Sequence, residues 1–451
     1  MQNKVLIANR GEIALRVIRA CKELGIKTVA VYSTADKDSL QVKFADESIC
    51  IGKEKSEDSY LNMNRILSAA ISTGCNAIHP GYGFLSENEK FVQIVEECNI
   101  KFIGPKSDVI AKLGNKSMAK KIAKQYHIPI VEGSDGPVLS AEEGFELAKK
   151  IGYPILIKAI NGGGGKGMSI VKNENDFIKL FYQTQMEAKA NFGDSEVYLE
   201  KFVENARHIE IQILADHFGN VIHLGERDCS MQRRNQKVIE ESPSPVMTPI
   251  LRRMMGQAAV HLAKGVGYEN AGTVEFIVDK DGKFFFIEMN TRIQVEHPVT
   301  ELATGFDLVK EQIKIAYNNP LTIKQKDVII SGHTIECRIN AEDPLNNFRP
   351  CPGLIKNIVF PGGNGVRIDT HIYASYVVPS YYDSMLAKLI VHAPSRKEAI
   401  RKMRVALEQF IIDGIITNID FLYVLMHNPE FVKGIYDTGF IKKVVEEALN
   451  G

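Results

Sequence analysis

EMNTRIQVEHP, residues 288–298, alternates polar with apolar residues and predicts an extended strand. Successive side chains of a strand point to opposite faces, so every second residue shares a face. On this pattern one face carries five polar or ionisable side chains: Glu288, Asn290, Arg292, Gln294 and Glu296. Two carboxylates, two amides and a guanidinium on one strand predict the wall of a ligand site.

The preceding segment is predicted to pair with this strand. Two apolar runs flank Asp281-Gly282, a dipeptide that favours a two-residue hairpin turn. That turn places Glu275 directly opposite Glu288, where like charges repel. A cation between them would offset the repulsion, and oxygen ligands that include Asn290 suit Mg²⁺ or Mn²⁺. The alternative is that both carboxylates point into solvent, where their repulsion is small.

A glycine-rich segment, KAINGGGGKGMSI, spans residues 158–170. Four consecutive glycines lose much backbone entropy on folding, which favours a functional loop whose N–H groups close over phosphates. A Walker A loop is excluded, because Gly167 stands where that motif needs Ser or Thr. Lys158 is the one charge in an apolar strand. The alternatives are an exposed turn and a lysine on an edge strand; together, the two features favour a nucleotide phosphate.

Positive charge is concentrated in RDCSMQRRNQK, residues 227–237. A charge run usually lies on a solvated face, and we expect this for Arg233 and Arg234. Lys237 begins the next predicted strand and could point into the same cleft as the strand of residues 288–298.

The N-terminal part is predicted to form a parallel sheet. A buried strand at residues 4–8, a helix at 12–24 and a second strand form a strand–helix–strand unit that continues to about residue 105. The first loop, ANRGEIA, lacks the GxGxxG pattern, so a dinucleotide site is not expected. The chain is therefore assigned to the α/β class, or α+β when the later antiparallel hairpins are included.

Composition excludes several classes of protein. The chain has 451 residues, enough for about three domains, with 55 Lys and Arg against 55 Asp and Glu. This balance gives no indication of nucleic-acid binding. No apolar run approaches the ~20 residues of a membrane span, and the N-terminus does not resemble a signal peptide. Seven cysteines without a CxxC pair are typical of reduced thiols in a cytoplasmic protein.

Taken together, five segments resemble biotin carboxylase, a family of ATP-grasp enzymes. They are ANRGEIA (8–14), HPGYGFLSEN (79–88), GGGGKGM (162–168), RDCSMQRRNQK (227–237) and EMNTRIQVEHPVTE (288–301). The resemblance implies an ATP-grasp architecture with a small lid and a large C-terminal domain of mainly antiparallel sheet. We expect these boundaries: an N-terminal α/β domain at 1–112, a connector at 113–130, the lid at 131–203 and the C-terminal domain at 204–451.

The resemblance also implies a binding site for ATP. Metal ions would be held by Glu275, Glu288 and Asn290, in agreement with the hairpin. The expected nucleotide contacts are Lys116, Lys158, Gly164 and Gly165 for the phosphates, Glu200, Lys201 and Val203 for adenine, and His208 and Gln232 for ribose. This chain has Asn235 where the family usually has His, so a nucleotide contact there would be through an amide.

Bicarbonate and biotin are the other substrates that the resemblance implies. Arg292, Gln294, the backbone of Val295 and Lys237 would hold bicarbonate, and Glu296 would act as the general base. Arg338 would stabilise the biotin enolate, and Tyr82 would line the biotin pocket. The expected catalytic residues are Arg292, Glu296, Lys237 and Arg338.

Two other hypotheses for the function remain. One is another ATP-grasp ligase, such as a carbamoyl-phosphate or purine-pathway carboxylating enzyme; the other is a catalytically silent ATP-binding protein. The chain has no AMKM-type biotin-attachment motif. We therefore expect biotin to arrive on a separate biotin carboxyl carrier protein, with carboxyltransferase subunits elsewhere. Acetyl-CoA carboxylase of fatty acid synthesis is the expected complex, with a split pyruvate carboxylase as the alternative. The family implies a homodimer, although Asn364 replaces a frequent interface aromatic.

Overall fold

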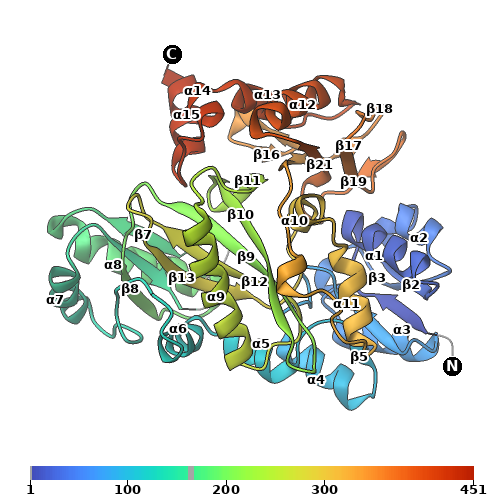
Figure 1. The fold of residues 1–451 in the computed structure, drawn as a ribbon, viewed down its shortest axis with the longest axis horizontal. Helices are drawn as coiled ribbons and strands as arrows, with labels where there is room; N and C mark the ends of the chain where they lie inside the picture. Colours follow the sequence, from blue (N-terminus) through green and yellow to red (C-terminus); the bar gives the residue numbers. More distant parts are fainter. Residues whose placement is uncertain (1–2, 161–166, 451) are drawn as a thin grey trace.

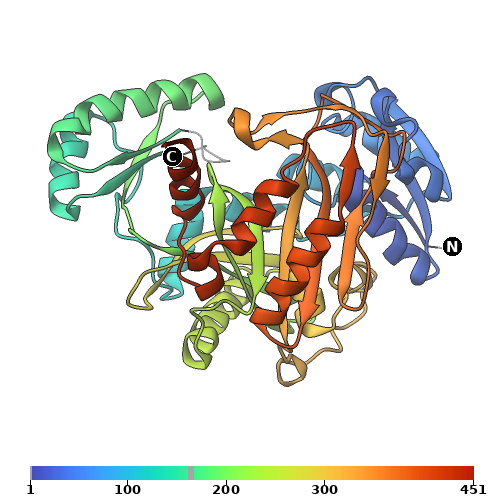
Figure 2. The ribbon, with the colours of Figure 1, turned by 90° about the horizontal axis from the view of Figure 1, so that it is seen from above.

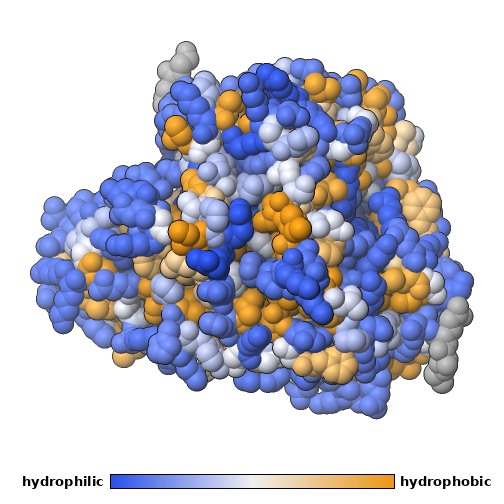
Figure 3. Space-filling view, viewed as in Figure 1, coloured by the Kyte–Doolittle hydropathy of each residue, from blue (hydrophilic) through white to orange (hydrophobic). Residues whose placement is uncertain are grey.

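The computed structural model describes residues 3–160 and 167–450, which form three units (Figure 1). Among these residues, none of the helices has the length and apolar character needed to span a membrane. Hydrophilic residues cover most of the face shown in Figure 3, and hydrophobic residues are scattered between them.

The N-terminal unit is built on a five-stranded parallel sheet of order β3-β2-β1-β4-β5. In its central strand, Val5, Leu6 and Ile7 are apolar and fully buried, as expected for a parallel sheet covered by helices. The expected parallel sheet is therefore confirmed. Its strands are β1 (Lys4–Ile7), β2 (Lys27–Ser33), β3 (Glu47–Gly52), β4 (Ala77–His79) and β5 (Lys101–Phe102). The helices of this part are α1 (Gly11–Glu23), α2 (Leu40–Phe44), α3 (Met63–Ser72), α4 (Glu89–Glu97), α5 (Ser107–Gly114) and α6 (Lys116–Gln125).

A small unit projects to the left in Figure 1 and carries a three-stranded antiparallel sheet of order β7-β6-β8. Phe177 and Phe181 stack within its own small core. Its named elements fall within residues 131–203, the range expected for the lid. Its elements are α7 (Ala141–Ile151), β6 (Ile155–Ala159), β7 (Met168–Val171), α8 (Phe177–Phe192) and β8 (Val197–Lys201).

The largest unit is an eight-stranded antiparallel sheet of order β13-β12-β9-β10-β11-β14-β21-β19. Two helices, α12 and α13, cover one face of its C-terminal half (Figure 2). The strands are β9 (Arg207–Ala215), β10 (Val221–Arg233), β11 (Gln236–Ser242), β12 (Asn270–Val278), β13 (Phe284–Asn290), β14 (His333–Asn340), β19 (Val366–Thr370) and β21 (Met385–Ala393).

Helices and short hairpins complete this unit. The helices are α9 (Pro249–Gly265), α10 (His297–Thr304), α11 (Leu308–Ala316), α12 (Arg396–Gln409), α13 (Ile419–His427), α14 (Pro429–Lys433) and α15 (Phe440–Asn450). The short strands are β15 (Glu342–Asp343), β16 (Arg349–Pro350), β17 (Gly353–Leu354), β18 (Asn357–Val359), β20 (Val377–Val378) and β22 (Ile411–Asp413).

The β12–β13 hairpin corrects one expectation and confirms another. The N–H of Asp279 donates to the carbonyl of Lys283 over 2.9 Å, so the turn has three residues rather than two. This shifts the pairing next to the turn by one position. A β-bulge after Glu275 shifts it back, and Glu275 does stand opposite Glu288. The predicted turn was wrong, but the predicted pair is correct.

The expectation of one continuous strand over residues 288–298 is also wrong. Strand β13 ends at Asn290, and α10 begins at His297 with Glu296 as its N-cap residue. Pro298 favours a helix start at this point, because its fixed φ suits the first turn. Residues 291–296 therefore form a loop, and strand alternation does not orient their side chains.

Candidate active site

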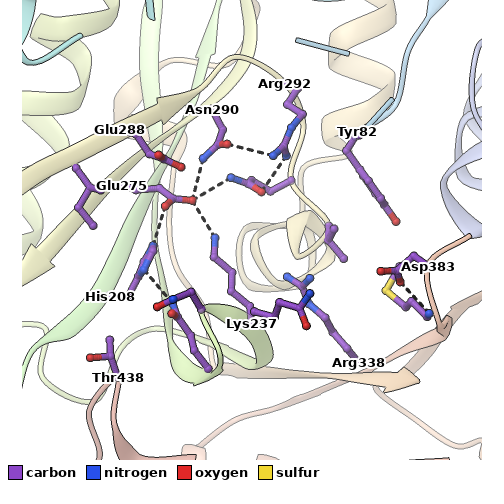
Figure 4. Close-up of a pocket in the computed structure, with 18 of the residues that line it drawn as sticks. Tyr82, His208, Lys237, Glu275, Glu288, Asn290, Arg292, Arg338, Asp383 and Thr438 are labelled. Carbon is purple, nitrogen blue, oxygen red and sulfur yellow. Dashed lines mark hydrogen bonds and ion pairs between the residues drawn. The ribbon is translucent and has the colours of Figure 1, made fainter. Parts of the chain in front are cut away.

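One cavity of about 870 Å³ lies where the three units meet. Nearly all the residues expected from the sequence line it, and Figure 4 shows several of them pointing toward its centre. They are Tyr82, Lys116, Lys158, Glu200, Lys201, Val203, His208, Gln232, Asn235, Lys237, Glu275, Glu288, Asn290, Arg292, Gln294, Val295 and Arg338. Glu296 is fully buried just beneath this lining. The expected phosphate contacts Gly164 and Gly165 lie outside the described residues.

Lys237 occupies the centre of the site. It is the second residue of β11, and its Nζ lies 2.6 Å from Glu210, 2.9 Å from Glu275 and 2.7 Å from Glu296. Burial opposes the charged amine, but the three carboxylates outweigh burial and hold the pKa of Lys237 well above its usual value. The amine is therefore a fixed positive charge. Glu210 was not among the residues expected to form the site.

Glu296 is held between two cations. Besides Lys237, the Nη2 of Arg338 lies 2.8 Å from Glu296, and Nε of Arg338 donates to Glu240 over 2.7 Å. Burial alone would raise the pKa of Glu296, but Lys237 and Arg338 outweigh it and hold the pKa well below its usual value. The carboxylate of Glu296 is therefore ionised at neutral pH.

The loop of residues 291–296 turns its polar groups into the cavity. Nη1 of Arg292 donates to Oε1 of Gln294 over 3.0 Å, and its Nη2 donates to Oδ1 of Asn290 over 3.1 Å. Its Nε donates over 2.8 Å to Glu87 of the N-terminal unit. This contact between units holds Arg292 at the site, although the strand that was expected to orient it has ended.

The residues expected to bind a metal fit Mg²⁺ in chemistry and position. Glu275 and Glu288 are cross-strand neighbours, and the amide of Asn290 donates to Glu275 over 2.9 Å. Burial would raise the pKa of Glu275, but Lys237 and His208 lower it, so this carboxylate is ionised. Together with Glu288 and Asn290 it offers the oxygen ligands that Mg²⁺ prefers. A second acidic group, His208 with Glu210 and Glu275, is less suitable, because Nζ of Lys237 contacts both of its carboxylates, whereas in the first pair it contacts Glu275.

The lid end of the cavity carries a cluster of lysines. Lys158 lies on β6, the central strand of the lid sheet, so the alternative of an edge strand is wrong. Its Nζ donates to Glu200 over 2.8 Å. Lys120 forms an ion pair with the same carboxylate. Sequence reasoning missed Lys120, although it follows Lys116 by four residues and so shares a helix face with it.

The β10–β11 turn and the strand residues beside it line another part of the cavity. Nε2 of Gln232 is 2.9 Å from Nδ1 of His208. Arg234 and Asn235 form a two-residue turn with φ of 50° and 62°, a conformation that Asn adopts readily. Arg234 is exposed as expected, whereas Arg233 is half-buried, with its guanidinium 3.9 Å from the Phe348 ring centre.

The sequence predicted few of the residues at the end of the cavity near the N-terminal unit. The hydroxyl of Tyr82 donates to Glu12, and Phe84, Tyr381 and Tyr382 line the same end. These aromatic residues come from loops far apart in the sequence, so periodicity gives no signal that they meet.

Comparisons with known proteins cover almost the whole chain. The chain matches the family models "Biotin carboxylase, N-terminal domain" over residues 1–110, "Carbamoyl-phosphate synthase L chain, ATP binding domain" over 115–324 and "Biotin carboxylase C-terminal domain" over 336–443.

Individual proteins resemble the chain over almost its whole length. A biotin carboxylase of Nostoc is 55% identical over 98% of this chain and 99% of its own. One of the subunits of the pyruvate carboxylase of Methanothermobacter thermautotrophicus is 53% identical over 98% of this chain and 90% of its own. The crystal structure of the biotin carboxylase domain dimer of Hydrogenobacter thermophilus 2-oxoglutarate carboxylase, with MgADP, ADP and bicarbonate, is 49% identical, has a TM-score of 0.95 and covers 98% of each chain. This chain therefore belongs to the biotin carboxylase family of ATP-dependent ligases.

Proposed function

We propose that the protein uses ATP and bicarbonate to carboxylate biotin carried on a separate biotin carboxyl carrier protein. The observation that carries the proposal is the ionised, buried Glu296 held between Lys237 and Arg338 at the wall of the cavity. A nucleotide-binding protein without this chemistry would have no need for a buried base between two cations.

ATP would lie between the lid and the eight-stranded sheet. Lys116 and Lys158 would bind its phosphates, together with Gly164 and Gly165. Glu200, Lys201 and Val203 would contact adenine, and His208, Gln232 and Asn235 would lie toward the ribose. Glu275, Glu288 and Asn290 would hold Mg²⁺ or Mn²⁺, which when bound neutralises negative charge on the phosphates.

Bicarbonate would bind to Lys237, Arg292, Gln294 and the backbone of Val295. Glu296 would remove its proton, so that a bicarbonate oxygen attacks the γ-phosphorus of ATP and ADP leaves. The product, carboxyphosphate, breaks down to CO₂ and phosphate. The phosphate takes the proton from the ureido nitrogen of biotin, and that nitrogen attacks CO₂ to give carboxybiotin. Arg338 would stabilise the biotin enolate, and Tyr82 would line its pocket.

The acceptor of the carboxyl group is proposed to be acetyl-CoA, within a multisubunit acetyl-CoA carboxylase of fatty acid synthesis. The support is the similarity to biotin carboxylases over the full length of the chain. The similarity to part of a pyruvate carboxylase and to a 2-oxoglutarate carboxylase domain favours a second candidate, a carboxylase of 2-oxo acids. We further propose a cytoplasmic homodimer that works with carboxyltransferase subunits.

Two measurements test these proposals. Phosphate release from ATP should require bicarbonate, and its rate should increase with free biotin. A rate that is independent of both substrates would contradict the proposed function. Affinity capture of the tagged protein from its own cells should bring down a biotinylated carrier. A carboxyltransferase for acetyl-CoA or for a 2-oxo acid in the same complex would then decide the acceptor.

A further inference from the structure

The loop that carries Glu296 has its peptide groups held one after another. Nη1 of Arg292 donates to the carbonyl of Ile293 over 3.2 Å. The ring Nδ1 of His297 lies 2.8 Å from the carbonyl of Gln294. Both contacts come from within the loop and its adjoining helix.

The next carbonyl, that of Val295, is held from a different part of the fold. Nζ of Lys388, on β21, donates to it over 2.9 Å across 93 residues of sequence. The Lys388 side chain is 0% exposed and does not line the cavity. Lysine is almost never fully buried unless it is paired, because removing the charged amine from water is costly. A residue of this kind in a core therefore indicates a specific task.

The charge of Lys388 is balanced from two sides. Its Nζ lies 3.1 Å from Oε1 of Glu12 on α1 and 3.9 Å from Oδ2 of Asp369 on β19. Glu12 also accepts a hydrogen bond from the hydroxyl of Tyr82, which lines the biotin end of the cavity. The ammonium is thus fixed in place by acids of two units while it donates to Val295.

We propose that Lys388 is a positioning residue for Glu296. The carbonyl of Val295 and the N–H of Glu296 belong to one planar peptide unit, so holding the carbonyl fixes the plane that leads into the Glu296 backbone. The side chain of Glu296 then starts from a defined direction toward Lys237 and Arg338. The inference rests on the proposed function, in which Glu296 takes the proton of bicarbonate, and it assigns no substrate contact to Lys388.

Loss of this hydrogen bond should affect bicarbonate more than ATP. The described residues proposed to bind ATP lie on α6, on the lid and on β9 to the β10–β11 turn, and none of these segments carries Lys388 or Val295. A small displacement of a reacting group can lower the rate by about 10²-fold. We therefore expect kcat/KM for bicarbonate to fall about 10- to 100-fold, with the KM for ATP unchanged.

The variants must separate positioning from folding. Lys388→Met alone leaves Glu12 with an unpaired buried charge, which can unfold the protein. The informative comparison is Glu12→Gln against the double variant Glu12→Gln/Lys388→Met, because both lack the acid and differ in the bond to Val295. Lys402→Met is the matched control: Lys402 also donates to a backbone carbonyl, that of His392 on β21, over 2.6 Å, but this carbonyl is not part of the loop of residues 291–296.

The experiment measures bicarbonate-dependent and ATP-dependent phosphate release, together with the unfolding temperature with and without bicarbonate. Wild-type protein without bicarbonate-dependent release would refute the proposed function itself. With an active wild type, the double variant should lose kcat/KM for bicarbonate relative to Glu12→Gln, at equal KM for ATP and without a lower unfolding temperature; Lys402→Met should behave as wild type. Unchanged bicarbonate kinetics in the double variant, or a loss that simply follows the unfolding temperature, would overturn the positioning role.

Discussion

Glu275 and Glu288 stand directly opposite each other on β12 and β13, yet only Glu288 keeps a substantial part of its side chain, 33%, exposed. Glu275 is buried and contacts Lys237, His208 and Asn290. The two carboxylates of the pair therefore do different work. Glu275 contacts both Asn290 and Lys237, whereas Glu288 lies 3.8 Å from Nζ of Lys116.

Replacing Glu288 should weaken metal use with little effect on folding. Glu288→Gln removes one charged oxygen ligand, so the Mg²⁺ concentration for half-maximal ATP cleavage should rise by about tenfold or more. A Mg²⁺ titration at saturating ATP measures this. Asp281→Asn, at the exposed turn of the same hairpin, is the control and should leave the titration unchanged. A wild-type Mg²⁺ requirement in Glu288→Gln would remove Glu288 from the metal site.

Replacing Glu296 and Arg338 should separate the two chemical steps. Glu296→Ala should lower the rate of bicarbonate-dependent ATP cleavage by about 10²–10⁴-fold, because a positioned general base contributes that much. Arg338→Gln should retain part of the ATP cleavage while carboxybiotin fails to form. Phosphate and carboxybiotin measured in parallel give the answer. Normal bicarbonate-dependent cleavage by Glu296→Ala would show that another group is the base.

Asn235 combines a backbone role with a proposed nucleotide contact, and Asn235→Gly separates them. Glycine adopts the φ of 62° without strain, so the unfolding temperature should hardly change. Loss of one hydrogen bond worth about 0.5–1.5 kcal/mol should raise the KM for ATP about two- to tenfold. An unchanged KM would mean that the side chain serves only the turn. Asn235→Val, which disfavours positive φ, should lower the unfolding temperature instead.

Glu241 should make stability depend on pH. It accepts two hydrogen bonds from Arg396, of 2.7 and 3.0 Å, and lies 2.5 Å from Nε2 of His333. Burial would raise its pKa, but His333 and Arg396 lower the pKa to about 2, from an ordinary value of 4.5. Because the folded-state pKa is the lower one, the stabilisation is complete above pH 4.5 and is lost as the pH falls toward 2.

At neutral pH, Glu241→Gln should therefore lower the free energy of unfolding by about 3–5 kcal/mol, as expected for breaking a buried pair. Denaturant titrations at several pH values should show the gap to wild type narrowing below pH 4.5. Glu430→Gln, which breaks an exposed pair with Lys443, should lower the free energy of unfolding far less than Glu241→Gln does. A gap for Glu241→Gln that stays constant down to the lowest pH would contradict the account.

Local pattern in the sequence predicted a large part of the fold and the site. The strand–helix–strand order predicted the parallel sheet, because each element needs only its own apolar spacing. The register expected from the Asp281-Gly282 turn predicted the pair Glu275 and Glu288, and Lys237 lines the cavity from the start of β11, as expected. Even the wrong turn left the pair intact, since a bulge after Glu275 restores the register.

Tertiary structure alone decided how the loop after Asn290 is arranged. Arg292 is held by Glu87, 205 residues away, and the carbonyl of Val295 by Lys388, 93 residues away. Periodicity records which face of an element is apolar, but it carries no information on which distant polar groups meet. For that reason the sequence by itself determined the strands and the residue types of the site. Packing between the units decided the direction of Arg292, the burial of Glu296 and the contacts of Lys388.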